Sequence, residues 1–204
     1  MPKTKSASRE ALVDNAMRTF WKNGYHVVSM GDLVRETGVS RGGIYTDFPG
    51  KQELFHACLD RYQETVITSL FAPVETGEEG IEGIRKYLDE LLSHFRADAG
   101  FGIGCLVGNT TGQIDPSEVG TLRKLQEHFA RLKKGFVRAL SQESDRGGRL
   151  TKAEIDELAS FAMISVQGMW SYSRSTTDAD VLQKFSNDLI TYLEERCRPS
   201  RQPS

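Results

Sequence analysis

Apolar residues recur at intervals of three and four along nearly the whole chain, which is the spacing of one face of an α-helix. Between residues 8 and 23 this face consists of Leu12, Val13, Ala16, Met17 and Phe20. Gly24 follows directly and suits the left-handed conformation that ends many helices. The pattern therefore predicts a first helix over residues 8–23.

Two short helices are predicted next. Ser29 precedes Asp32 by three residues, which is the spacing of a capping box, so we expect a helix over residues 29–37. A second short helix is expected over residues 40–48, because the proline that follows does not fit a helix interior. The connection, Gly38–Val39, is short enough for the tight glycine-containing turn of a helix-turn-helix.

Longer amphipathic helices follow, and the predicted fold is all-α with about nine helices. The starts of two of them are marked by capping-box spacing, at Thr76 with Glu79 and at Thr151 with Glu154. The first clear break after the short helices is expected in the stretch APVETGEEG, residues 72–80, which holds Pro73 and two glycines. The predicted ranges are about 51–70, 76–95, 116–140, 151–170 and 178–196.

Composition excludes several classes of protein. No stretch approaches the roughly 18 unbroken apolar residues of a membrane span, and no apolar run follows the basic N-terminus as in a secretory signal. The three cysteines, Cys58, Cys105 and Cys197, are odd in number and widely spaced, which argues against a disulfide framework or a zinc site. We therefore expect a cytoplasmic protein without a metal or cofactor.

Charge points weakly to an anionic partner for the N-terminal part. The whole chain has a net charge of −2, but residues 1–55 hold eight Lys or Arg and only six Asp or Glu. The stretch VSRGGIYTDFPGK, residues 39–51, then places two adjacent glycines in a predicted helix beside exposed bases. Each glycine costs a helix about 1 kcal/mol relative to alanine. Gly42 and Gly43 make sense if the helix backbone must closely approach the backbone of DNA.

The neighbours of these glycines fit the same interpretation. Ser40 can cap the helix and leave its first amides directed at a phosphate, where the positive end of the helix dipole lies. Arg41 can reach a phosphate or the edge of a guanine, since the first residues of a recognition helix contact bases.

Over roughly residues 10–60 the chain resembles the tetracycline-repressor (TetR) family of bacterial transcription regulators. The residues that carry the resemblance are Gly24-Tyr25, Gly38-Val39-Ser40, Gly43, Tyr45, Phe48 and Lys51-x-Glu53-Leu54. The resemblance implies an all-helical homodimer whose N-terminal helices bind a double-stranded DNA operator. It also implies a C-terminal domain that binds a small-molecule effector and thereby weakens DNA binding. We expect a DNA-binding domain over residues 1–52, a ligand-binding and dimerisation domain over 53–198, and a disordered tail over 199–204.

The resemblance also implies individual roles. Four residues are expected to be structural: Gly38, Val39, Ile44 and Phe48. The expected DNA-binding residues are Ser29, Ser40, Arg41, Gly42, Gly43, Tyr45, Thr46 and Lys51. Taken singly, Tyr45 could be a buried core aromatic, Lys51 a solvated surface lysine and the glycine pair a loop.

One position departs from the family pattern. Asp47 stands where the family commonly has His or Tyr. A carboxylate near phosphates is repelled, so Asp47 either turns away from DNA or accepts a hydrogen bond from a cytosine amine. Because Asp47 has these two possible roles, the sequence does not determine which operator bases are read.

The last two helices carry broad apolar faces. In a monomer these faces would all be core, whereas the resemblance implies that the helix pair forms a four-helix bundle with a second copy. Such a dimer would place two recognition helices roughly 34 Å apart, one turn of DNA.

The effector site is expected between helices of the C-terminal part, although plain core packing is an alternative for every candidate. The candidates are Phe101, Cys105, Asn109, Phe129, Met163, Gln167 and Trp170. The string GCLVGN, residues 104–109, resembles a branch of the family that includes regulators of the acrylate and N-ethylmaleimide-reductase type, which implies reactive carbonyl effectors. A helix start would lower the pKa of the Cys105 thiol, whereas burial would make it unreactive, and the sequence leaves both open.

The sequence offers less support for two other functions. An enzyme is disfavoured, because GFGIG lacks the glycine spacing and the strand of a dinucleotide loop. Cys105 with His94 or His128 also lacks an orienting third group, so no catalytic residue is expected. A helical adaptor that no longer binds DNA is favoured only by Asp47 and the nearly neutral N-terminal part. The sequence predicts a dimeric transcriptional repressor released by a small ligand, with activation left open.

Overall fold

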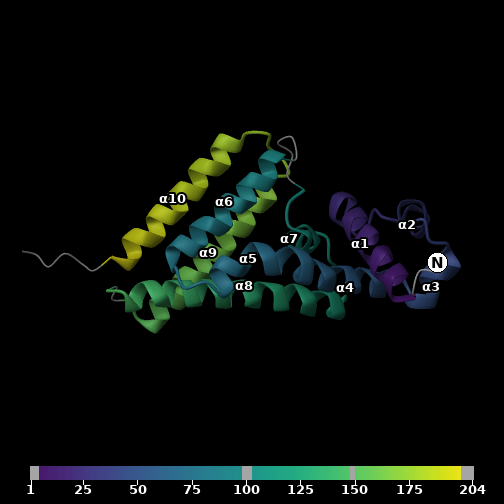
Figure 1. Ribbon diagram of the computed structural model, residues 1–204, viewed down its shortest axis with the longest axis horizontal. Helices are drawn as coiled ribbons and strands as arrows, with labels where there is room; N and C mark the ends of the chain where they lie inside the picture. The colour runs from purple at the N-terminus through teal and green to yellow at the C-terminus, as the bar shows by residue number, and fades with distance from the viewer. Residues whose placement is uncertain (1–4, 98–102, 148–149, 199–204) are drawn as a thin grey trace, which may run out of the picture. The chain divides into compact units, whose positions relative to one another are not determined.

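The computed structural model describes residues 5–97, 103–147 and 150–198 of the chain. Almost all of these residues are helical, and no strand occurs among them, so the predicted all-α class is confirmed (Figure 1). No helix in the same ranges is long and apolar enough to span a membrane. The predicted tail over residues 199–204 lies outside the described residues.

The described residues form ten α-helices and one π-helical turn. In chain order they are α1 Lys5–Asn23, α2 Met30–Thr37, α3 Arg41–Asp47, α4 Lys51–Tyr62, the π-turn η1 Gln63–Ile67, α5 Thr68–Glu75, α6 Ile81–Ala97, α7 Leu106–Thr111, α8 Val119–Asp145, α9 Lys152–Tyr172 and α10 Ala179–Cys197.

These elements fall into two compact units. Unit one consists of residues 1–67 together with 105–126, and unit two of residues 68–104 together with 127–204. The first part of α8 thus belongs to unit one and the remainder to unit two. Unit one includes a segment that lies far along the sequence from its other residues. The expected domain boundary between residues 52 and 53 stays a prediction.

Unit one is built around α1, which packs against α4, α2 and α7. At the centre the Phe20 and Phe55 rings meet edge to face, with centroids 5.0 Å apart. Leu33 of α2 and Ile44 of α3 are both fully buried. These two anchors leave the other faces of the short helices toward solvent.

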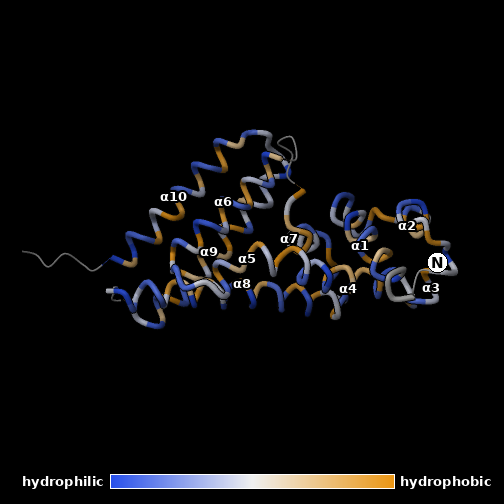
Figure 2. Tube along the Cα trace, in the orientation of Figure 1, coloured by the Kyte–Doolittle hydropathy of each residue, from blue (hydrophilic) through white to orange (hydrophobic). Residues whose placement is uncertain are grey.

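Unit two has its own aromatic centre. Phe71 of α5 contacts the rings of Tyr87 and Phe136 edge to face, at centroid distances of 5.1 and 5.4 Å. Gly135 is required here, because a Cβ at this position would lie only 2.4 Å from Phe71 Cε1. α6 packs against α5 and α10, and α10 also packs against α9. Figure 2 shows hydrophilic and hydrophobic stretches alternating along α10.

Several predicted helix limits were wrong. The predicted break over residues 72–80 is present between α5 and α6, although Pro73 itself lies inside α5. The predicted helix over 51–70 is interrupted by the π-turn. The predicted capping box at Thr76 does not form, because Thr76 Oγ1 donates to the Ala72 carbonyl and Glu79 pairs with Lys86. α8 runs five residues beyond its predicted end at residue 140. The box at Thr151 and Glu154 is present.

Candidate nucleic-acid interface

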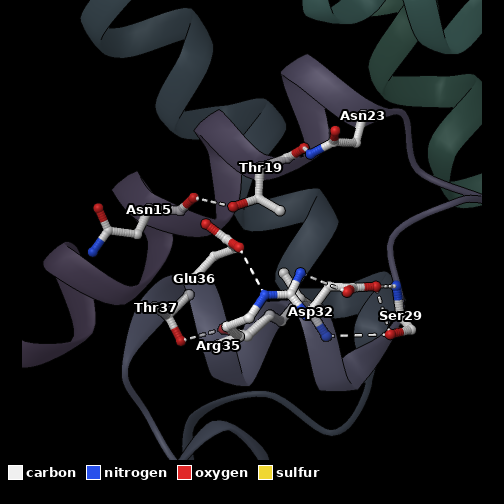
Figure 3. A network of polar contacts seen from close by, with 9 residues as sticks. Asn15, Thr19, Asn23, Ser29, Asp32, Arg35, Glu36 and Thr37 are labelled. Atoms are coloured by element: carbon white, nitrogen blue, oxygen red, sulfur yellow. Dashed lines mark hydrogen bonds and ion pairs between the residues drawn. The ribbon is translucent and has the colours of Figure 1, made fainter.

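The start of α2 is fixed by the predicted capping box. Ser29 Oγ accepts a hydrogen bond from the Asp32 amide at 3.2 Å, and the Ser29 amide donates to Asp32 Oδ2 at 2.9 Å. The Ser29 hydroxyl also donates to Oδ2 at 2.6 Å (Figure 3). These hydrogen bonds, the side-chain one foremost, lower the pKa of Asp32 to about 2. Ser29 is therefore held with a set geometry at the helix start.

The positive charge of α2 is compensated within the helix. The Arg35 guanidinium lies between two carboxylates, at 2.8 Å from Asp32 Oδ1 and 3.0 Å from Glu36 Oε1 (Figure 3). Both pairs are solvent-exposed, so they contribute little to stability. One cation and two carboxylates leave this cluster with a net charge of −1, so Arg35 is not an isolated cation at this surface.

The turn after α2 has the predicted form. Gly38 adopts φ 69°, a left-handed conformation, and its amide donates to the Val34 carbonyl at 3.0 Å. Thr37 Oγ1 accepts from the Val39 amide at 3.2 Å. Three residues, 38–40, separate α2 from α3, which fits the short turn of a helix-turn-helix.

α3 presents one face to solvent. Ser40 caps the helix by accepting from the Gly43 amide at 3.1 Å. Four of the predicted DNA-binding residues are exposed on this helix: Arg41, Gly42, Tyr45 and Thr46. Tyr45 is 47% exposed, which excludes the alternative of a buried core aromatic. The exposed face combines a base, an aromatic hydroxyl and a threonine.

The two glycines of α3 differ. A Cβ on Gly42 would meet no atom within 4 Å. The fold itself therefore leaves room for a larger residue at this position. A Cβ on Gly43 would lie 2.9 Å from Val39 Cγ1 and 3.3 Å from Ser40 Oγ. The packing of the turn against the helix therefore already requires a glycine at 43. For Gly42 the packing of the chain gives no such reason, and its close approach to DNA stays a prediction.

α3 carries one cation at its start, Arg41, and one carboxylate at its end, Asp47. Within the described residues Arg41 is exposed and has no ion-pair partner. Asp47 at the other end of the helix is half-buried. Whether Asp47 turns away from DNA or contacts a cytosine stays open.

Lys51 begins α4 and is not a freely solvated lysine. Its Nζ lies 4.5 Å from the centroid of the Tyr25 ring, in a cation–π arrangement. Burial lowers the pKa of Lys51, and the nearby Glu118 carboxylate opposes this effect. Lys51 is held in place by these neighbours at the start of its helix.

Arg9 is a candidate that the sequence did not reveal. Its guanidinium stacks over the Phe48 ring, with Cζ 4.6 Å from the ring centroid, at the end of α3. Arg9 is exposed, so a third base joins Arg41 and Lys51 around the short helix. The two residues of this contact are far apart in the chain, and no local pattern predicts such a pair.

The predicted effector residues are distributed over both units. Cys105 and Asn109 belong to unit one, whereas Phe129, Met163, Gln167 and Trp170 belong to unit two. Phe101 lies outside the described residues. The structure therefore does not test whether these residues form one site.

Cys105 is at a helix start, as predicted, but it is buried. Its Sγ accepts from the Gly108 amide at 3.4 Å and caps α7. Burial raises the pKa of the Cys105 thiol, although hydrogen bonds from Gly108 and Tyr62 oppose the rise. This favours the packed alternative over a reactive thiolate. Cys58 and Cys197 are buried as well, and burial raises the pKa of Cys197 to about 11.

The candidates on α9 form a half-buried row. Met163, Gln167 and Trp170 recur at helical spacing beside the fully buried face of the helix. Gln167 Oε1 is buried and has no hydrogen-bond partner among the described residues. Such a group costs free energy and calls for an explanation. No cluster of His, Cys, Asp or Glu suited to a metal ion occurs in the described ranges.

Comparisons with known proteins bear on both units. Residues 12–58 match the family model described as bacterial regulatory proteins, tetR family. The HTH-type transcriptional repressor ComR of Escherichia coli (strain K12) is 26% identical over 191 residues, covering 94% of this chain and 91% of that protein.

Solved structures share the whole fold. A TetR transcriptional regulator from Chloroflexus aurantiacus superposes with a TM-score of 0.82 at 23% identity, covering 96% of this chain and 98% of that one. A cysteine mutant of the TetR family regulator CifR, complexed with 26-base-pair operator DNA, gives a TM-score of 0.79 at 19% identity. It covers 89% of this chain and 94% of its own.

Proposed function

The chain carries the N-terminal domain of the tetR family of bacterial regulatory proteins, and we propose that it is a homodimeric repressor that a small molecule releases from its operator. The observation that carries this proposal is the exposed face of α3, where Arg41 stands without an ion-pair partner beside Gly42, among the described residues. The chain is a transcriptional regulator and not an enzyme.

The short helices supply two kinds of DNA contact. Ser29 and Ser40 cap α2 and α3, and the free amides beside these caps suit phosphate oxygens. Arg41 at the start of α3 is placed to contact a base edge in the major groove. Lys51 and Tyr45 would contact phosphates, which fixes the orientation of the helix without reading sequence.

Dimerisation is proposed through α9 and α10. Unit two exposes six large apolar side chains on these helices: Phe161, Ile164, Tyr172, Val181, Phe185 and Tyr192. The Phe161 and Tyr192 rings are 4.9 Å apart, so the two helices contribute to one apolar surface. Contiguous exposed apolar surface marks an interface, and a second copy would bury it by two-fold symmetry.

The effector is proposed to bind in the C-terminal part near Gln167. The buried carbonyl oxygen of Gln167 lacks a partner among the described residues, and Met163 and Trp170 lie next to it along α9. A mostly apolar small molecule that carries one N–H or O–H group would satisfy this oxygen. Because burial raises the Cys105 pKa, we propose non-covalent binding of the effector and not thiol capture.

A mobility-shift titration on the DNA upstream of the protein's own gene tests the function. We expect a retarded band whose affinity falls steeply as salt rises, because phosphate contacts release counterions. Arg41→Ala is expected to weaken the complex and change sequence preference, whereas Lys51→Ala weakens binding to all sequences alike. Absence of binding to this DNA and to any sequence selected from a random library would favour the adaptor alternative.

A further inference from the structure

The connection between α7 and α8, residues 112–118, lies in unit one and contacts the corner between α1 and α2. The Gln113 carbonyl accepts a hydrogen bond from His26 Nε2 at 2.6 Å. The Gln113 side chain lies flat on Gly24, where a Cβ would be only 2.8 Å from Gln113 Oε1. Gly24 has φ 87°, a left-handed conformation that favours glycine, and the end of the Gln113 side chain packs against it. Gln113 thus holds both sides of the corner that leads into Ser29.

The same connection also reaches the start of α4. Glu118 Oε2 accepts from Gln52 Nε2 at 3.5 Å, and Glu118 Oε1 is 3.9 Å from His26 Nε2. The pKa of Tyr25 is raised, chiefly by burial and next by the Glu118 carboxylate. Tyr25 is the ring on which Lys51 rests. One carboxylate therefore lies beside the corner, the Tyr25 ring and the first turn of α4.

Two further contacts tie α4 to the first turns of α8. His56 Nε2 and Thr121 Oγ1 form a hydrogen bond of 2.8 Å, and Lys124 donates to Asp60 at 2.6 Å. With the Glu118 contact these form a row of three bridges. α4 is thereby held at each turn by residues that come after α7 in the chain.

We propose that residues 112–118 position the DNA-binding face, with Gln113 and Glu118 as positioning residues on which DNA affinity depends. The inference rests on the proposed function and adds to it the residues that hold the DNA-binding face in place. Ser29 and Lys51, which we expect to contact phosphates, lie at the two places that the connection holds. Loosening it would change the spacing of these contacts without unfolding either short helix.

Gln113→Ala is the cleanest test, because it removes the side chain from Gly24 without altering charge. The matched control is Gln126→Ala, since Gln126 is exposed, lies in the same unit and has no hydrogen-bond partner among the described residues. With DNA selected from a random library, we expect Gln113→Ala to lower affinity three- to tenfold, because the side chain no longer packs on Gly24, while the hydrogen bond from His26 to the Gln113 carbonyl remains. The control is expected to bind like the wild type.

Glu118→Ala separates positioning from simple electrostatics by the sign of its effect. Removing a carboxylate beside Lys51 would strengthen DNA binding if only charge mattered. The proposal instead expects affinity to fall, because the contact with Gln52 is lost. Stronger binding by this variant would overturn the assignment of Glu118.

Amide hydrogen exchange supplies a readout that a purely structural role would not change. Since coupling is reciprocal, DNA binding should slow exchange in residues 106–118 of the wild type, and Gln113→Ala should lose most of this protection. Equal affinity and equal protection in Gln113→Ala and wild type would overturn the inference and leave the DNA-binding function standing. A wild type that binds no DNA would overturn both.

Discussion

Replacing Gly42 with alanine should make the protein more stable and a worse DNA binder. The added Cβ meets nothing within 4 Å, and alanine is favoured over glycine in a helix by about 0.5–1 kcal/mol. The free energy of unfolding should therefore rise by that amount. The same methyl group would stand between α3 and the DNA backbone, and forcing a methyl into a closely packed contact costs about 1–3 kcal/mol. DNA affinity should fall about tenfold or more.

Gly43→Ala is the companion variant and should behave in the opposite way with respect to folding. Its Cβ would lie 2.9 Å from Val39 Cγ1, and a β-branched valine has little freedom to move aside. We expect a loss of stability of about 1–2 kcal/mol after the gain in helix propensity is subtracted.

Both variants are measured by urea unfolding and by fluorescence anisotropy with labelled DNA at fixed salt. A Gly42→Ala protein that is more stable and binds DNA like the wild type would refute the docking of this helix face. A Gly42→Ala protein that is less stable than the wild type would contradict the finding that a Cβ at this position meets no other atom.

Three further variants address other parts of the molecule. Ile164→Glu, at a side chain that is 64% exposed, should leave the fold intact and convert the dimer to monomer in analytical ultracentrifugation; an unchanged dimer would exclude this surface as the interface. Gln167→Met should raise unfolding free energy by about 1 kcal/mol or more, because it removes a buried carbonyl without a partner among the described residues, and a loss of stability would show that the oxygen is satisfied. The lowered pKa of Asp32, about 2 against an ordinary 3.8, contributes stability that is complete above pH 4 and lost as pH falls through 2. Asp32→Asn should lack this acid-dependent loss in thermal unfolding followed by circular dichroism, and identical acid profiles would contradict the assignment.

The parts of the fold that the sequence predicted well depend on contacts between near neighbours. The caps at Ser29, Ser40 and Thr151 and the left-handed Gly38 are each satisfied within a few residues, so local patterns indicate them reliably. The break within residues 72–80 was also predicted, but local signals did not show that α5 continues past Pro73 to Glu75.

In the candidate site, too, the features set by neighbouring residues could be predicted and those set by distant contacts could not. The exposed residues of α3 could be predicted from the motif, whereas Arg9 over Phe48 and Gln113 against Gly24 could not. Those pairs join residues that are dozens of positions apart, and only tertiary packing brings them together. The burial of Cys105 likewise depends on neighbours that no local pattern names, which is why the thiol pKa could not be settled from the sequence.

The discontinuity of unit one limits how this protein can be divided into exchangeable parts. A fragment that ends at residue 67 would lack residues 105–126, including the buried Leu106 and Val107 of α7, and would expose the sides of α1 and α4 that α7 covers. A chimera that borrows only the N-terminal helices would face the same mismatch. A chimera designed to transfer the DNA specificity of this regulator should therefore include both residues 1–67 and residues 105–126, because the two segments fold as one unit.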